Sequence, residues 1–149
     1  MARYFFPPKS LKIEVSAVVR AQRSRRIVVA VDTAATSTHI SPEVAQFIGL
    51  DLANPIRHAN VVTASRVERA PVVRLPSLTT LGKTVNELEV VVHTLPPQAG
   101  LDGLLGLNFF VDYTLFVNYS RGILVIQDRK PRTLWHRLRQ AIELWKSMG

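Results

Sequence analysis

One aspartate stands where the chain can deliver an acid for chemistry. Asp32 ends the apolar run 27–31 and is followed by the small residues Thr33, Ala34 and Ala35. Burying an unpaired carboxylate is costly, so an acid in this place either belongs to an ordinary turn or is held for a reaction. Asp-Thr is also a common loop dipeptide, and these residues alone leave both interpretations open.

The elements that would position Asp32 are strands. Residues 11–19 begin with alternating apolar and polar residues, which is the period of a half-buried strand, and residues 27–31 form a second apolar strand. The polar and basic residues 21–26 are expected to connect them. The sequence therefore predicts a hairpin that ends at Asp32.

A short helix is predicted after this strand. Ser41 suits the N-cap, Pro42 suits the first helical position, and Gly49 can close the C-terminus. Apolar residues at positions i, i+3 and i+4 predict a buried stripe of Val44, Phe47 and Ile48.

The rest of the domain is predicted to be mainly strands. Residues 60–95 are rich in Val, Thr and Leu and are interrupted by Pro71 and Pro76, which favours several short strands, the last of them over 86–94. After a turn at Asp102 we expect further elements in this order: Leu104-Leu105-Gly106, a short helix over 107–111, and a hairpin of 114–118 with 122–127.

The last segment has a helical period. Its apolar residues recur at i, i+1, i+4, i+7, i+8 and i+11: Leu134, Trp135, Leu138, Ala141, Ile142 and Trp145. Docking of this amphipathic helix on its own domain or on a partner subunit is the favoured interpretation. Contact with an anionic membrane surface is the alternative.

Composition limits the class of protein. The chain has 149 residues, 47% of them hydrophobic and 20% charged, which suits one folded domain. It has no cysteine, and no apolar stretch approaches a spanning helix, so we expect a soluble, cytoplasmic protein. The net charge of +8 is concentrated in residues 1–26 and 121–149. No aromatic-interleaved stripe accompanies these ends, so a solvated surface is favoured and no nucleic-acid partner is expected.

Four segments together resemble the retropepsin-like aspartic proteases, particularly their compact single-lobed bacterial members. Residues 31–36 stand where that family has its catalytic Asp-Thr/Ser-Gly-Ala motif, and residues 40–45 resemble its following helix. Residues 62–65 are similar to the start of its flap, and residues 102–110 to its second signature of two apolar residues and a glycine. The similarity extends over most of residues 11–127.

The resemblance implies a mainly β fold. We expect a single-lobed closed β-barrel or sandwich with short helices and a C-terminal amphipathic helix, active as a two-fold homodimer. The expected division is an N-terminal extension over 1–10, the protease domain over 11–127, and a basic C-terminal amphipathic helix over 128–149.

The same resemblance implies an endopeptidase. Such enzymes use two carboxylates that share one proton and hold a water molecule, because like charges about 3 Å apart cannot both ionise cheaply. This chain has one such motif, so a homodimer would supply the second Asp32. A peptide or protein is the expected substrate, and no metal or cofactor is expected. The alternative is a catalytically impaired dimer of the same fold that binds peptides or serves as a scaffold.

Roles for individual residues follow from the resemblance. Asp32 would be catalytic, Thr33 would brace the paired loops across the dimer axis, and the amide of Ala34 would contact the carboxylate. The remaining residues assigned to support of this loop are Ala35, Leu104, Leu105 and Gly106. The residues assigned to a flap that closes over substrate are Thr63, Ala64, Ser65, Arg66 and Val67.

Three positions depart from the family's pattern. Ala34 replaces the motif glycine, and a positive φ there would cost an alanine roughly 1–2 kcal/mol. Arg66 stands near the flap tip, where glycine is common, and a long cation there would restrict closure or bind acidic substrate. Asn108 stands where related bacterial sequences often have Asp, and a structural role is expected for it. The four histidines lack metal-ligand spacing and are expected to be ordinary surface or core residues: His39, His58, His93 and His136.

Overall fold

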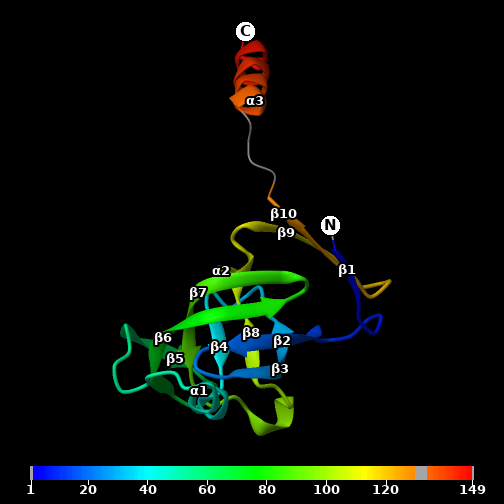
Figure 1. Cartoon of the computed structure of the whole chain (residues 1–149). Helices are drawn as coiled ribbons and strands as arrows, with labels where there is room; N and C mark the ends of the chain where they lie inside the picture. The colour runs from blue at the N-terminus through cyan, green and yellow to red at the C-terminus, as the bar shows by residue number, and fades with distance from the viewer. Residues whose placement is uncertain (1, 130–133, 149) are drawn as a thin grey trace.

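Six strands close into a barrel in the computed structural model, which describes residues 2–129 and 134–148 (Figure 1). The sheet order is β2-β3-β8-β4-β7-β6-β5, and an additional pairing of β2 with β6 closes the barrel and leaves β5 outside the ring. The strands of this sheet are β2 (Glu14–Arg20), β3 (Ser24–Val31), β4 (Thr38–Ile40), β5 (Arg57–Val62), β6 (Val67–Thr80), β7 (Lys83–Val92) and β8 (Gly103–Leu105).

Two parallel pairings bring distant segments together at the centre of the barrel. β3 pairs with β8, with Val31 opposite Leu105, and β4 pairs with β7, with Ile40 opposite Val92. β4 also pairs antiparallel with β8. The ends of β3 and β8 are thereby adjacent, and the ends of β4 and β7 lie beside the start of β8.

The predicted hairpin that ends at Asp32 is confirmed, with one change of boundary. β2 and β3 pair antiparallel from Glu14 opposite Ala30 to Arg20 opposite Ser24. β3 therefore begins within the basic segment that was expected to be a connection, and only residues 21–23 turn. Cross-strand hydrogen bonds outweigh the polar character of these residues because their side chains remain at the surface.

The predicted short helix is confirmed as α1 (Pro42–Ile48). The hydroxyl of Ser41 accepts a hydrogen bond from the amide of Val44 at 3.3 Å, and Gly49 ends the helix with φ of 84°. The left-handed conformation at this C-terminal position favours glycine because it has no Cβ.

The predicted buried face of α1 is partly wrong. Val44 and Ile48 are buried, but Ala45 rather than Phe47 completes the face, and Phe47 is 43% exposed. The guanidinium groups of Arg23 and Arg25 lie 5.1 and 5.2 Å from the centre of its ring. Two cations therefore cover the ring in place of the core.

The prediction of several short strands over residues 60–95 is also wrong for its middle part. β6 is one strand of 14 residues that runs through both prolines. Its first half pairs with β5 and its second half with β7, and Pro76 falls where the β7 register is interrupted between Leu75 and Ser77. Because the strand exchanges one partner for another, it tolerates residues that lack an amide hydrogen.

A second, three-stranded sheet has the order β1-β10-β9. It contains β1 (Ala2–Phe5) and the hairpin of β9 (Tyr113–Asn118) with β10 (Ile123–Asp128), which was predicted from sequence. The segment 1–10, expected as an extension, thus contributes a strand to the fold. Short helical turns at η1 (Pro97–Ala99) and α2 (Leu107–Phe110) complete the domain. One hydrophobic core includes residues from both sheets, the largest fully buried ones being Phe109, Ile27, Ile40, Ile48, Leu75, Leu78, Leu105, Leu124 and Ile126.

The C-terminal segment forms the predicted helix, α3 (Leu134–Ser147). Residues 138–148, whose side chains the structure describes, are all exposed, including Leu138, Ile142 and Trp145. Over these residues the helix does not pack on its own domain. Docking on a partner subunit stays a prediction, with contact with a membrane surface as the alternative. Within the described part of the chain, no helix has the length and apolar character needed to cross a bilayer.

Candidate active site

Asp32 lies directly after β3, in a loop that fixes its carboxylate. Its Oδ1 accepts hydrogen bonds from the amides of Ala34 at 3.0 Å and Ala35 at 3.3 Å. Its own amide donates to the carbonyl of Leu105 at 3.0 Å. Aspartate commonly closes a turn through such bonds to amides further along the chain. Here the turn also sets the direction in which the acid projects.

The backbone at Ala34 is not strained by the replacement of glycine. The non-glycine residues with positive φ in the described chain are Lys9, Leu81 and Glu87, and Ala34 is not among them. The penalty of a left-handed conformation therefore does not apply. Ala34 is exposed, and its amide points back at the Asp32 carboxylate.

The segment after β8 is hydrogen-bonded to the loop that carries Asp32. The amide of Leu107 donates to the carbonyl of Ala35 at 2.9 Å, and the amide of Asn108 donates to that of Thr36 at 3.1 Å. Gly106 is buried, and a Cβ built on it would overlap the backbone of Ser37. The two chains approach so closely here that only glycine fits.

Asn108 ties three segments together. Its Oδ1 accepts from both the amide and the hydroxyl of Thr38, at 2.8 and 2.9 Å, and its Nδ2 donates to the carbonyl of Glu89 at 2.7 Å. The Thr38 hydroxyl, which is buried, also accepts from the amide of Gly106 at 3.1 Å. This amide side chain thus joins β4, β7 and the segment after β8, and the geometry is that of a structural residue.

We expect Asn108→Ala to lower the free energy of unfolding by about 3 kcal/mol, because it leaves the buried donors of Thr38 without an acceptor. Urea denaturation followed by circular dichroism measures the change. Asn54→Ala is a matched control, since Asn54 makes an exposed hydrogen bond to Asp51 and its loss should cost below about 1 kcal/mol. Equal losses in the two variants would contradict the structural role of Asn108.

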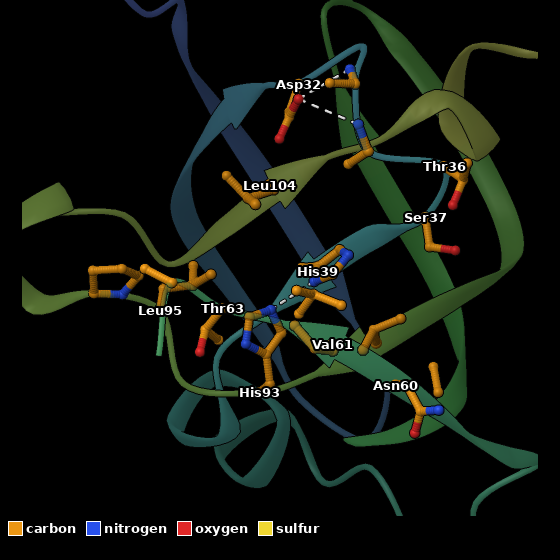
Figure 2. Close-up of a pocket in the computed structure, with 17 residues that line it drawn as sticks. Asp32, Thr36, Ser37, His39, Asn60, Val61, Thr63, His93, Leu95 and Leu104 are labelled. Carbon is orange, nitrogen blue, oxygen red and sulfur yellow. Dashed lines mark hydrogen bonds between the residues drawn. The ribbon is translucent and has the colours of Figure 1, made fainter. Parts of the chain in front are cut away.

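A cavity of about 570 Å³ lies beside Asp32 (Figure 2). Figure 2 shows Asp32 at one end of the residues that line it, with His39 and His93 nearer the centre. Those residues come from the loop after β3, from β4, from β5 and the turn after it, from β7 and the segment after it, and from β8. The lining consists of Asp32, Ala34, Ala35, Thr36, Ser37, His39, Ala59, Asn60, Val61, Val62, Thr63, Ala64, Val91, His93, Leu95, Pro96 and Leu104.

Some of the residues predicted for the site line the cavity and others do not. Asp32, Ala34, Ala35, Leu104, Thr63 and Ala64 line the cavity. Leu105 and Gly106 are buried, and Thr33 is exposed at the loop surface. The tip residues Ser65, Arg66 and Val67 are exposed and do not line the cavity.

The segment predicted as a flap is a hairpin of β5 and β6. The amide of Thr63 donates to the carbonyl of Arg66 at 2.8 Å, and the amide of Arg66 donates to the Thr63 hydroxyl at 3.2 Å. The guanidinium of Arg66 pairs with Glu68 at 2.6 Å. In this arrangement the charge of Arg66 is paired with an acid at the start of β6.

Sequence reasoning missed a pair of histidines. Nδ1 of His39 and Nε2 of His93 are 2.6 Å apart, and the two rings are nearly perpendicular at 81°. Burial, followed by the neighbouring His93, lowers the pKa of His39 to about 4, against an opposing effect of Asp32. The two residues are 54 positions apart in the chain. They meet because β4 and β7 are parallel neighbours. A prediction of that strand pairing would have been needed to bring the two histidines together.

The lowered pKa of His39 makes the free energy of unfolding depend on pH. In the folded chain the pKa of His39 lies below its ordinary 6.5, so on acidification the unfolded chain takes up this proton first. Stability is therefore lost as the pH falls from about 6.5 to about 4. We expect the wild type to lose roughly 1–2 kcal/mol more than His39→Val over this range, after allowance for solvent screening at a partly exposed ring.

Urea denaturation at several pH values measures this difference. His58→Gln is the control, because His58 is exposed and should leave the profile of the wild type unchanged. Parallel profiles for wild type and His39→Val would contradict the prediction.

Metal ligands do not gather in this region. Among the described residues, no group of three or more His, Cys, Asp or Glu side chains is placed to hold a metal ion. The histidine pair and Asp32 are the ionisable side chains that line the cavity.

The closed β-barrel carries the Asp32 loop against the Leu104-Leu105-Gly106 segment, which is the arrangement expected from the resemblance to retropepsin-like aspartic proteases. Residues 20–112 match the family model described as gag-polyprotein putative aspartyl protease. This match covers more than half of the chain, and the protein belongs to that family.

The fold is similar to a crystal structure of a retropepsin-like aspartic protease from Rickettsia conorii. The TM-score is 0.63 with 20% sequence identity, and the alignment covers 83% of this chain and 89% of that one. A comparison with curated proteins gives no significant match. The similarity establishes a shared fold with a bacterial retropepsin-like protein.

Proposed function

We propose that this protein is an aspartic endopeptidase whose active form is a two-fold homodimer, with one Asp32 from each subunit. The observation that carries the proposal is the Asp32 carboxylate, held by two amides at the end of a cavity. Membership in a family of aspartyl proteases supports the same reaction class.

The need for a second subunit follows from the number of acids. The described cavity contains one carboxylate, whereas hydrolysis of an amide requires an acid and a base together. Thr33 and Ala34 are exposed on the same loop, so this surface is accessible to a second copy of the chain. In a symmetric dimer each loop meets its own counterpart, and the two Asp32 carboxylates face each other across the axis.

The proposed chemistry uses one shared proton. The ionised Asp32 of one subunit removes a proton from a water molecule, which attacks the peptide carbonyl carbon. The protonated Asp32 of the other subunit donates its proton to the carbonyl oxygen. Collapse of the tetrahedral gem-diol then breaks the C–N bond. One of its hydroxyl groups returns a proton to the second Asp32, and the leaving amine takes a proton from the first carboxyl, which restores the starting pair.

The cavity supplies the binding surface for the peptide. Its walls combine apolar side chains such as Val61 and Leu95 with polar groups such as Asn60 and the histidine pair. The β5–β6 hairpin forms one wall, and its closure over a bound peptide would exclude water from the reaction.

Cleavage of peptides by the purified full-length chain tests the proposal. A mixture of diverse peptides is incubated at pH 4, 5, 6 and 7, products are identified by mass spectrometry, and the oligomeric state is measured by sedimentation. We expect endoproteolytic products from the dimer. A stable dimer that cleaves no peptide at any of these pH values would overturn the enzymatic function, and cleavage by a strict monomer would overturn the dimer.

A further inference from the structure

The histidine pair in the cavity has a defined hydrogen-bond direction. Nδ1 of His93 lies 3.1 Å from the carbonyl oxygen of Thr94. A carbonyl oxygen can only accept, so Nδ1 of His93 carries a proton. In neutral His93 the other nitrogen, Nε2, is then an acceptor. It lies 2.6 Å from Nδ1 of His39, which must be the donor in this bond.

This chain of bonds decides what His39 offers to a ligand. With its proton on Nδ1, neutral His39 presents Nε2 as a bare acceptor on the far side of the ring from His93 (Figure 2). Nε2 has no hydrogen-bond partner within the described chain. Since no side-chain nitrogen or oxygen there is both buried and unpartnered, Nε2 is open to the cavity.

One added proton converts Nε2 of His39 from an acceptor to a donor, whichever of the two histidines it binds. If it binds His39, both ring nitrogens of His39 are protonated and Nε2 becomes a donor. If it binds His93, then Nε2 of His93 becomes the donor to Nδ1 of His39, and the proton of neutral His39 moves to Nε2. In both forms Nε2 of His39 carries a proton, and the pair carries one positive charge.

We propose that His39 and His93 form a specificity subsite whose preference inverts with one proton: the neutral pair favours a substrate side chain that donates, such as Gln, and the protonated pair favours a carboxylate, such as Glu. This inference rests on the proposed function, since it assigns the substrate class of the same cavity. His39 is the residue that contacts substrate, and His93 is the positioning residue that sets its tautomer.

Asp32 is the other ionisable side chain that lines the cavity with this pair. Asp32, from the loop after β3, is the acidic group whose charge acts on His39, and His93 at the end of β7 is the basic one. The other neighbours are uncharged: Leu104 from β8, Asn60, Val61 and Thr63 from β5 and its turn, and Leu95 after β7.

Nitrogen NMR of the intact wild-type protein tests the switch without any need for activity. Imidazole ¹⁵N shifts distinguish a protonated nitrogen from a bare one, and His39→Val identifies the signals of His39 by their loss. We expect Nε2 of His39 to change from bare to protonated in a single titration step, while Nδ1 of His93 stays protonated throughout. A proton on Nε2 of His39 at neutral pH would overturn the proposal.

Matched peptides test the preference. Cleavable peptides that differ only by Glu or Gln, substituted in turn at each of four positions on either side of the scissile bond, are compared one pH unit above and below the NMR midpoint. Where the lower pH falls below about 4.3, the ordinary pKa of Glu, cysteic acid replaces Glu because its sulfonate stays ionised. At one position we expect the Glu-to-Gln ratio of kcat/KM to rise about tenfold on acidification, as for a hydrogen bond to a charged group. The His39→Val variant reports the effect of the peptide's own ionisation alone, and it should show no such rise. The His58→Gln variant should behave as the wild type.

Failure of this inference is distinct from failure of the proposed function. Active enzyme with the same change of ratio in wild type and His39→Val would overturn the subsite and leave the protease intact. If wild type cleaves nothing, the same peptides are measured by calorimetric binding. A Glu-to-Gln preference that inverts with pH in wild type and not in His39→Val would then support the subsite, and an unchanged preference would overturn it.

Discussion

Asp32→Asn should abolish peptide cleavage while the fold and the dimer persist. The amide side chain can still accept through its oxygen from Ala34 and Ala35, so the loop should keep its geometry. It can neither take a proton from water nor share one with its counterpart, and we expect kcat/KM to fall at least about 10³-fold. Cleavage assays measure the loss, and circular dichroism and sedimentation verify the fold and the dimer. Retention of wild-type activity would remove Asp32 from the reaction.

Mixing the two proteins tests whether the site is shared between subunits. After exchange of subunits, a fixed amount of wild type should keep about half of its activity with an equal amount of Asp32→Asn and about one tenth with a ninefold excess, because mixed dimers have one carboxylate. Heat-denatured Asp32→Asn serves as the control and should have no effect. Activity that does not respond to the folded variant would show that one subunit is a complete enzyme.

Gly106→Ala should cost at least about 3 kcal/mol of stability, the second large effect that we expect. The new Cβ would meet the backbone of Ser37 and Thr38, which cannot move aside as a flexible side chain can. The same shift would displace the loop that carries Asp32, through the bonds from Leu107 to Ala35 and from Asn108 to Thr36. Thermal unfolding measures the loss of stability, and residual cleavage measures the displacement of the loop.

Gly100→Ala is the matched control for this variant. Gly100 has φ of 62° and nothing within 4 Å of the position that a Cβ would take. Its replacement should cost only the strain of a left-handed alanine, about 1–2 kcal/mol. If both variants lost the same stability, close packing at Gly106 would not be the reason for glycine there.

Elements with local signals were predicted well from the sequence. Ser41, Pro42 and Gly49 mark the two ends of α1, and the hairpin before Asp32 has the expected order of strands. Buried faces were less predictable. Phe47 fits an apolar stripe in the sequence, yet Arg23 and Arg25 cover its ring at the surface, because the β2–β3 hairpin bonds to the end of the helix and brings them there.

Long strands were poorly predicted for a related reason. Pro71 and Pro76 indicate breaks when each residue is judged by its own conformational preference. β6 continues through them because β5, β7 and β2 pair with different parts of it. β5 and β7 are the hairpin neighbours of β6, and β2 is distant in the sequence; the conformational preference of a proline by itself contains none of these pairings.

Local features of the chain identify which acid is available and how it is delivered. Asp32 follows an apolar strand, and its carboxylate accepts from amides of the turn directly after it. A second segment, Leu104-Leu105-Gly106, indicates the class of fold. These properties depend on side chains within a few residues and on patterns that a strand or turn imposes locally.

The conformation of Ala34 and the chemistry of the cavity depend on how the whole barrel is assembled. The backbone at Ala34 avoids positive φ, so the loss of the motif glycine brings no strain. His39 and His93 look unrelated in the sequence and become hydrogen-bonded when β4 and β7 pair in parallel. Pairing of strands is settled by burial and backbone hydrogen bonds over the whole barrel, and it alone places two rings beside the Asp32 loop.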